Sequence, residues 1–173
     1  MFIKSRYDIL LGRPGTEVIE RPKPFLGDEH LIIYGPRQSG RTQALIDDMV
    51  NYSRLGNKVC FFSDTQHQSD MASLRIPAGL YEHCFFFYTY SNFQATNIRG
   101  LDFDGLYLDD FIQRPEDFSQ RLDFFNAIMP LFCHDIRIVI ASMTKEMPFD
   151  TTGALNNVFT ERLWTFRELA PRP

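Results

Sequence analysis

The chain has 173 residues, of which 44% are hydrophobic and 23% are charged. This length and composition are typical of one globular domain with a substantial core, and they exclude a disordered chain. The formal net charge of −4 excludes a surface that is basic throughout, so any contact with nucleic acid would have to be local.

The cysteines and the apolar runs indicate the cellular compartment in which the protein is expected. Three widely spaced cysteines lie within apolar runs, which favours buried thiols in a reducing compartment over a disulfide framework or a zinc site. The N-terminal residues do not form a secretory signal, and no apolar run approaches the length needed to cross a membrane. We therefore expect a cytoplasmic protein with no membrane partner.

Residues 1–30 are the least regular part of the sequence. Prolines and glycines interrupt every periodic pattern there, so we expect an irregular lead-in with a short helix near residues 7–11. This segment either covers an edge of the sheet or packs beside a ligand through Arg21, Pro22 and Phe25.

A glycine-rich stretch follows the first predicted strand. The apolar run 31–34 stops at Gly35, a second glycine follows at Gly40, and Arg41 and Thr42 open an amphipathic segment. This is the spacing of the phosphate-binding loop G-x-x-x-x-G-K-[ST], with arginine at the lysine position. Glycines let backbone amides turn toward an anion, and the following helix adds the positive end of its dipole. The predicted anion site comprises Gly35, Pro36, Arg37, Gln38, Ser39, Gly40, Arg41 and Thr42. The alternative is a plain turn that leaves Arg41 in solvent.

The rest of the chain alternates between helical and strand patterns. Hydrophobic periodicity predicts helices over 43–54, 65–74 and 115–130, and strands over 58–62, 81–90, 106–108, 136–141 and 160–169. The last helix would begin at Pro115 and bury an apolar face made of Phe118, Leu122, Phe125 and Ile128. This alternation predicts an α/β fold with three layers, in which a mostly parallel central sheet is flanked by helices on both faces.

Polar side chains follow three of the predicted strands. The glycine loop follows the first, Asp109 and Asp110 follow the strand at 106–108, and Ser142 and Thr144 follow the strand at 136–141. Because ligands of parallel sheets bind beyond the carboxyl ends of the strands, we expect these groups to meet at one edge.

These groups match the needs of nucleotide hydrolysis, which are charge neutralisation, a held Mg²⁺ and an oriented water. Thr42 would coordinate Mg²⁺ through its hydroxyl, Asp109 would hold the metal through water or from outside its direct ligands, and Asp110 would polarise the attacking water. An arginine that reaches the transferring phosphoryl group accelerates the reaction, and Arg37 and Arg99 are the candidates.

Each of these assignments has a structural alternative. Asp109 and Asp110 would otherwise be turn or capping carboxylates, and Arg99 would otherwise form a structural salt bridge. Ser142 and Thr144 either sense the γ-phosphate or make the ordinary hydrogen bonds of a strand end.

Taken together, the motifs resemble the ATPase domain of the large terminase subunit, the P-loop NTPase motor that packages DNA into tailed-phage and herpesvirus capsids. The resemblance rests on the loop 35–42, on residues 98–100 ahead of 106–110, and on residues 140–144. It implies Arg41 at the catalytic lysine position, Arg37 near the γ-phosphate, Thr42 and Asp109 at the metal, and Asp110 at the catalytic acid.

The resemblance also implies cofactors and partners. These are ATP and Mg²⁺, double-stranded DNA, portal or other packaging proteins, and a homo-oligomeric ring in the host cytoplasm. Two departures, Arg41 for lysine and Asp110 for glutamate, favour the alternative of a nucleotide-binding interaction module with weak or no hydrolysis. We expect one ATPase domain over residues 1–173, since this length leaves no room for the nuclease domain usual in large terminases. A helicase-like ATPase is a lesser alternative, because no second motor domain is present.

Overall fold

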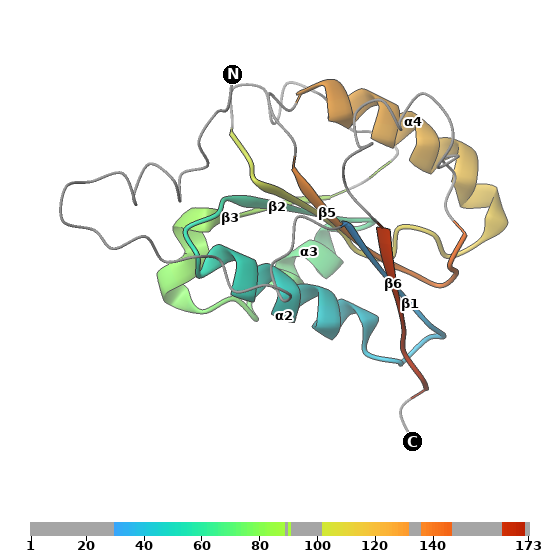
Figure 1. The fold of residues 1–173 in the computed structure, drawn as a ribbon, viewed down its shortest axis with the longest axis horizontal. Helices are drawn as coiled ribbons and strands as arrows, with labels where there is room; N and C mark the ends of the chain where they lie inside the picture. The colour runs from blue at the N-terminus through green and yellow to red at the C-terminus, as the bar shows by residue number, and fades with distance from the viewer. Residues whose placement is uncertain (1–29, 89, 91–101, 132–135, 147–163, 172–173) are drawn as a thin grey trace.

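The computed structural model describes residues 30–88, 90, 102–131, 136–146 and 164–171. Its strands are β1 (His30–Tyr34), β2 (Val59–Ser63), β3 (Cys84–Tyr88), β4 (Gly105–Leu108), β5 (Arg137–Ser142) and β6 (Trp164–Glu168). They form one sheet in the order β3-β2-β4-β5-β1-β6, with every neighbouring pair parallel (Figure 1). The predicted lead-in and its short helix lie outside the described residues.

Helices cover both faces of this sheet. Helices α2 (Arg41–Ser53) and α3 (Gln66–Ser73) lie on one face and α4 (Phe118–Ile128) on the other (Figure 1). A hydrophobic core lies on each face of the sheet. Alternate residues of each central strand contribute to one core or the other, because successive side chains of a strand point to opposite faces. In β5, Ile138 and Ile140 join the core under α4, whereas Val139 and Ala141 join the core under α2. The predicted three-layer α/β architecture, with a parallel central sheet flanked by helices on both faces, is therefore confirmed.

The predicted elements are recovered with shorter bounds at two places. The aromatic run at 81–90 contains a strand only over β3, and a 3-10 helix, η1 (Ala78–His83), precedes it. Of the last predicted strand, Trp164–Glu168 forms β6, Leu169 lies beyond its end, and residues 160–163 lie outside the described residues. Short 3-10 turns, η3 (Pro115–Asp117) and η4 (Met129–Leu131), flank α4 at the two prolines that the sequence placed at its ends. No helix in the described part of the chain is long and apolar enough to cross a membrane.

The predicted apolar face of α4 packs on the core, and the buried face is wider than predicted. Phe125 and Ile128 are buried, and Phe118 and Leu122 are partly buried and packed against the same core. Arg121 and Phe124 are buried as well, and with Phe125 and Ile128 they follow the i, i+3, i+4, i+7 spacing of one helical stripe. The arginine is accommodated because its Nε donates to the Phe111 carbonyl at 2.6 Å and its guanidinium lies 4.3 Å from the centre of the Tyr90 ring.

Strand β5 lies between the strand that leads into the glycine loop and the strand that leads into the two aspartates. Main-chain hydrogen bonds join the ends of all three. The Gly35 amide donates to the Ser142 carbonyl at 3.3 Å, and the Phe111 amide donates to the Ala141 carbonyl at 2.9 Å. The Met143 amide donates to the Ile112 carbonyl, also at 2.9 Å. The glycine loop and the aspartates are thereby held at the same edge of the sheet.

Candidate functional site

The loop between β1 and α2 has a backbone suited to binding an anion. Gln38 and Gly40 adopt positive φ angles of 61° and 86°, so left-handed residues alternate with others along the loop. Such alternation turns successive amides toward one side. Helix α2 has no side chain that caps its first turn, and its first amides are therefore left without intrahelical acceptors. The Ser39 amide donates to the Pro36 carbonyl at 3.3 Å, and the other amides between Arg37 and the first turn of α2 are the ones that could bind an anion.

The start of this loop also requires a glycine. A Cβ atom built on Gly35 would lie 2.5 Å from the Leu169 carbonyl oxygen and 2.9 Å from the Ser39 hydroxyl. The chain that leaves β6 thus passes directly against the loop, held by a 2.8 Å bond from the Leu169 amide to the Tyr34 carbonyl.

Thr42 and Asp109 lie side by side. The Thr42 hydroxyl is 2.9 Å from one carboxylate oxygen of Asp109 and 3.2 Å from the other. Asp109 is only 2% exposed, and its backbone is fixed because its amide donates to the Phe62 carbonyl at 2.9 Å. The Tyr90 hydroxyl lies 2.6 Å from the Asp109 carbonyl oxygen. A hydroxyl from the loop and a carboxylate from the end of β4 therefore meet with little freedom to separate.

The electrostatics of Asp109 favour a cation beside it. Burial and, next, repulsion from Asp110 raise the pKa of Asp109 to about 7, while the hydrogen bond from Thr42 acts in the opposite direction. A bound cation would relieve this penalty, and hydroxyl and carboxylate oxygens are ligands that Mg²⁺ prefers. The described residues contain no group of three or more His, Cys, Asp or Glu side chains that would hold a metal alone. The remaining ligands would have to be water and phosphate oxygens, as is usual for Mg²⁺.

Arg41 and Asp110 bind each other in this structure. One guanidinium nitrogen of Arg41 donates to the Gly35 carbonyl, and the other lies 3.0 Å from a carboxylate oxygen of Asp110. The second carboxylate oxygen of Asp110 accepts a 3.2 Å bond from the Gln68 side-chain amide. Asp110 also has a positive φ of 45°, an uncommon backbone state for a residue that carries a Cβ.

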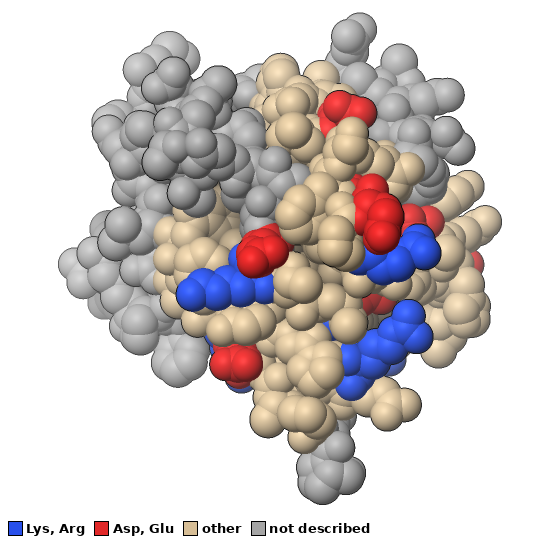
Figure 2. Space-filling view, turned by 90° about the vertical axis from the view of Figure 1, so that its right-hand side faces the viewer, with Lys and Arg blue, Asp and Glu red and all other residues tan. Residues whose placement is uncertain are grey.

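These residues border a pocket of about 650 Å³, within the range of small-molecule sites. Arg37 is exposed on its rim. Seen toward the carboxyl edge of the sheet, basic and acidic side chains are interspersed, and no continuous basic surface is visible in this view (Figure 2). The residues lining the pocket are Arg37, Gln38, Ser39, Gly40, Arg41, Thr42, Gln43, Gln68, Arg75, Asp110 and Gln113.

Gly35, Pro36 and Asp109 adjoin these residues but do not line the pocket, and the remaining predicted residues lie apart from it or outside the described chain. The Ser142 side chain is fully buried, and its hydroxyl donates to the Ile112 carbonyl at 3.1 Å. The Thr144 hydroxyl donates to the Glu146 carbonyl at 3.2 Å. These are the strand-end bonds of the alternative interpretation. Arg99 lies outside the described residues, and its role stays a prediction.

Four lining residues were not predicted, namely Gln43, Gln68, Arg75 and Gln113. Gln68 forms a capping box with Thr65 at the start of α3, in which the Thr65 hydroxyl accepts from the Gln68 amide and the Gln68 side chain accepts from the Thr65 amide. The T-x-x-Q pattern is visible in the sequence. It places the glutamine on the first turn of α3, but it does not show that the same side chain also reaches Asp110.

Comparison with known proteins does not assign this chain to a family. No protein-family model matches the chain, and no curated protein matches it. Among solved structures, the chain is similar to AMPPCP-bound DnaA from Aquifex aeolicus, with 17% sequence identity and a TM-score of 0.35. The likeness covers 80% of this chain and 40% of the DnaA chain, so this chain spans about two fifths of that structure. A likeness of this degree does not identify a function.

Proposed function

We propose that this chain binds ATP with Mg²⁺ at the glycine loop and hydrolyses it. The observation that carries the proposal is the 2.9 Å contact between the Thr42 hydroxyl and the buried Asp109 carboxylate. This contact brings the glycine loop and the aspartate that follows β4 together in one site. The sequence indicated each of these two features independently of the other. A plain glycine turn would not account for a buried carboxylate aimed at the first turn of the following helix.

Each residue then has a definite task. The loop amides and the N-terminus of α2 would bind phosphate oxygens. Thr42 and Asp109 would hold Mg²⁺, which supplies neutralisation of phosphate charge. Arg41 would contact the terminal phosphates, and Asp110 would accept a proton from the water that attacks the γ-phosphorus as the bond to ADP breaks. Arg37, which lines the rim of the pocket, would contact the γ-phosphate.

The pairing of Arg41 with Asp110 supports a second candidate. In this arrangement the cation that would bind phosphate neutralises the carboxylate that would activate water. Arg41 must exchange Asp110 for phosphate before hydrolysis can proceed, so basal turnover is expected to be slow. If that exchange does not occur in solution, the chain is a nucleotide-binding interaction module, the alternative that the two sequence departures favour.

We further propose a more specific role, in which the chain is a terminase-like motor domain that acts on double-stranded DNA. It is supported by the order of the motifs along the sequence, and its partners would be DNA, portal or other packaging proteins, and further copies of the chain in a ring. Since charges of both signs are interspersed on the face shown in Figure 2, DNA binding would depend on a local basic surface or on partners.

The test is release of phosphate from ATP by the purified chain, with and without Mg²⁺ and duplex DNA. Thr42→Val removes the hydroxyl at nearly constant shape, and Thr42→Ser is its matched control because it retains the hydroxyl. Asp109→Ala removes the carboxylate. We expect slow Mg²⁺-dependent turnover that Thr42→Ser preserves and that Thr42→Val and Asp109→Ala abolish.

The outcomes separate the candidates. Turnover that is indifferent to both Thr42→Val and Asp109→Ala would refute the site. ATP binding without turnover, in the presence of Mg²⁺ and DNA, would establish the interaction module. Stimulation by duplex DNA is the result expected of a motor, and its absence in an otherwise active protein would count against the terminase-like role.

A further inference from the structure

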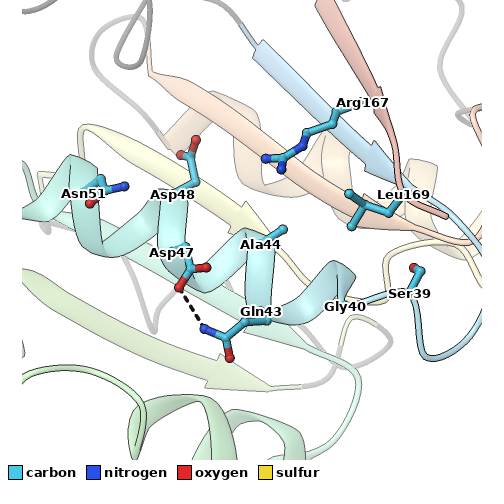
Figure 3. A pocket seen from close by; sticks show the side chains of 9 residues that line it. All are labelled: Ser39, Gly40, Gln43, Ala44, Asp47, Asp48, Asn51, Arg167 and Leu169. Atoms are coloured by element: carbon cyan, nitrogen blue, oxygen red, sulfur yellow. Dashed lines mark hydrogen bonds between the residues drawn. The ribbon is translucent and has the colours of Figure 1, made fainter. Parts of the chain in front are cut away.

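A second pocket adjoins the first on the other side of the glycine loop. It has a volume of about 330 Å³ and lies between α2 and the chain around the end of β6 (Figure 3). Ser39, Gly40 and Gln43 line both pockets. The loop therefore forms a shared rim, with Asp110 on one side and the second pocket on the other.

The lining of this second pocket comes from two elements that face each other. Asp47 and Asp48 project from α2, and Arg167 and Leu169 come from the opposite side (Figure 3). Residues two apart on an extended chain point to the same face of a sheet, which explains why Arg167 and Leu169 both lie toward α2. Figure 3 shows Arg167 reaching from β6 toward the Asp48 side of the helix.

The polar lining combines two carboxylates on α2, the amides of Gln43 and Asn51, and one cation, Arg167, on β6. Asp47 is exposed, and one of its carboxylate oxygens accepts a 2.8 Å bond from the Gln43 amide, which leaves further acceptor capacity. The Asp48 carboxylate is held by Arg137 and by the Tyr107 hydroxyl at 2.8 Å. Asp48 is therefore already engaged, whereas the exposed Asp47 carboxylate can accept from a ligand that offers N–H or O–H donors. Ala44 and Leu169 add apolar surface beside them.

An unpartnered hydroxyl lies where the two pockets meet. Ser39 is only 6% exposed, and its Oγ has no hydrogen-bond partner among the described residues. A buried hydroxyl that lacks a partner is destabilising. The hydroxyl has almost no exposed surface here, so a ligand that crosses the rim would supply the missing bond once the Ser39 side chain turns toward it.

We propose that the second pocket binds the nucleoside part of the nucleotide, with the purine between Leu169 and α2 and Asp47 accepting from its donor groups. This inference rests on the proposed function, since it takes the catalytic side of the loop to hold the terminal phosphates. The phosphate chain then crosses the rim at Ser39 and Gly40, and Arg167 covers the base from β6. The ligand class is a purine nucleotide with an exocyclic amino group.

The test compares two ligands that share the phosphates. Inorganic tripolyphosphate carries the phosphate chain alone, whereas ATP adds ribose and adenine, and calorimetric titration in Mg²⁺ gives both affinities. Asp47→Ala and Arg167→Ala remove exposed side chains of the second pocket. Asp70→Ala and Arg54→Ala are matched controls, because both residues are exposed and line neither pocket.

We expect the wild-type protein to bind ATP more tightly than tripolyphosphate. Asp47→Ala should weaken ATP binding about tenfold, the effect of losing one hydrogen bond to a charged group. Arg167→Ala should weaken it several-fold through loss of the guanidinium contact with the base. Both variants should leave tripolyphosphate binding unchanged. The control variants should match the wild type. Equal affinity of the wild type for the two ligands would overturn the nucleoside pocket while leaving the phosphate loop in place. ATP affinity unchanged in both pocket variants would overturn it too. Binding of neither ligand would overturn the proposed function itself.

Discussion

Replacing Asp109 by asparagine should make the protein more stable at neutral and alkaline pH while removing its activity. The side chains are nearly isosteric, and an asparagine oxygen can still accept the hydrogen bond from Thr42. The substitution removes only the negative charge, which is buried and lies next to Asp110. The same charge is what the proposed metal site requires. Stability and function should therefore change in opposite directions.

The size of the effect follows from the pKa of Asp109. Its pKa is about 7 in the folded protein, against an ordinary value of 3.8 for an aspartate in solvent. Between these values the folded state binds more protons than the unfolded state, so the free energy of unfolding falls as pH rises. Below pH 3.8 Asp109 is protonated in both the folded and the unfolded state. Above about pH 7 it is charged in both, and the loss of stability caused by its burial is complete. Each pH unit between them changes the free energy of unfolding by about 1.4 kcal/mol, so from about pH 5 to about pH 8 the wild type should lose about 2–3 kcal/mol through this group.

The assay is thermal or urea unfolding of both proteins at several pH values across the same range. Burial also raises the pKa of Asp48, but that residue is present in both proteins and its contribution cancels in the difference. The melting temperature of Asp109→Asn relative to the wild type should rise by about 5–10 °C across this range. Mg²⁺ with ADP should flatten the pH dependence of the wild type and not that of the variant. Parallel pH profiles for the two proteins would refute the claim that folding buries a charge on Asp109 at a cost in stability.

Three further predictions concern the loop and its support. Arg41→Lys should retain ATP binding, because the charge remains and lysine also binds phosphate, whereas Arg41→Ala should lose about tenfold or more in calorimetric titration; equal loss in both would contradict a role for the charge. Gly35→Ala should lower the free energy of unfolding by about 1–3 kcal/mol in urea, since its Cβ would meet the Leu169 carbonyl, and should weaken ATP binding; a variant indistinguishable from wild type would show that the chain after β6 does not pass against the loop. Asp48→Ala should lower the free energy of unfolding by about 3–5 kcal/mol, because the buried Arg137 would lose its ion pair. A loss below about 1 kcal/mol would mean that this pair is solvated.

The sequence was most informative where a local pattern determines the geometry. The run of residues into Gly35 and the doublet after β4 each predicted a strand end, and the parallel sheet brings such ends to one edge. That reasoning anticipated the contact between Thr42 and Asp109. The identity of Arg41 at a fixed spacing from the glycines likewise placed it in the pocket.

Side-chain partners that depend on distant segments were not predictable in the same way. Nothing near Arg41 in the sequence indicates that it pairs with Asp110, 69 residues away. Arg121 appears polar in a helical pattern, yet it is buried because Asp64, Phe111 and Tyr90 surround its guanidinium. Periodicity assigns a residue to a face by its hydrophobicity, and it therefore misplaces a buried cation whose partners come from other elements.

The position of β5 has a mechanical consequence. Because this strand is bonded to both neighbours along its length and also at its exit, the loop and the Asp109 strand end cannot move apart without breaking the sheet. The backbone beneath the first pocket is therefore rigid, and the side chains that line the pocket are the part that can adjust to a bound ligand. Arg41, Asp110 and Gln68 form a chain of polar contacts that can rearrange without displacing any backbone ladder.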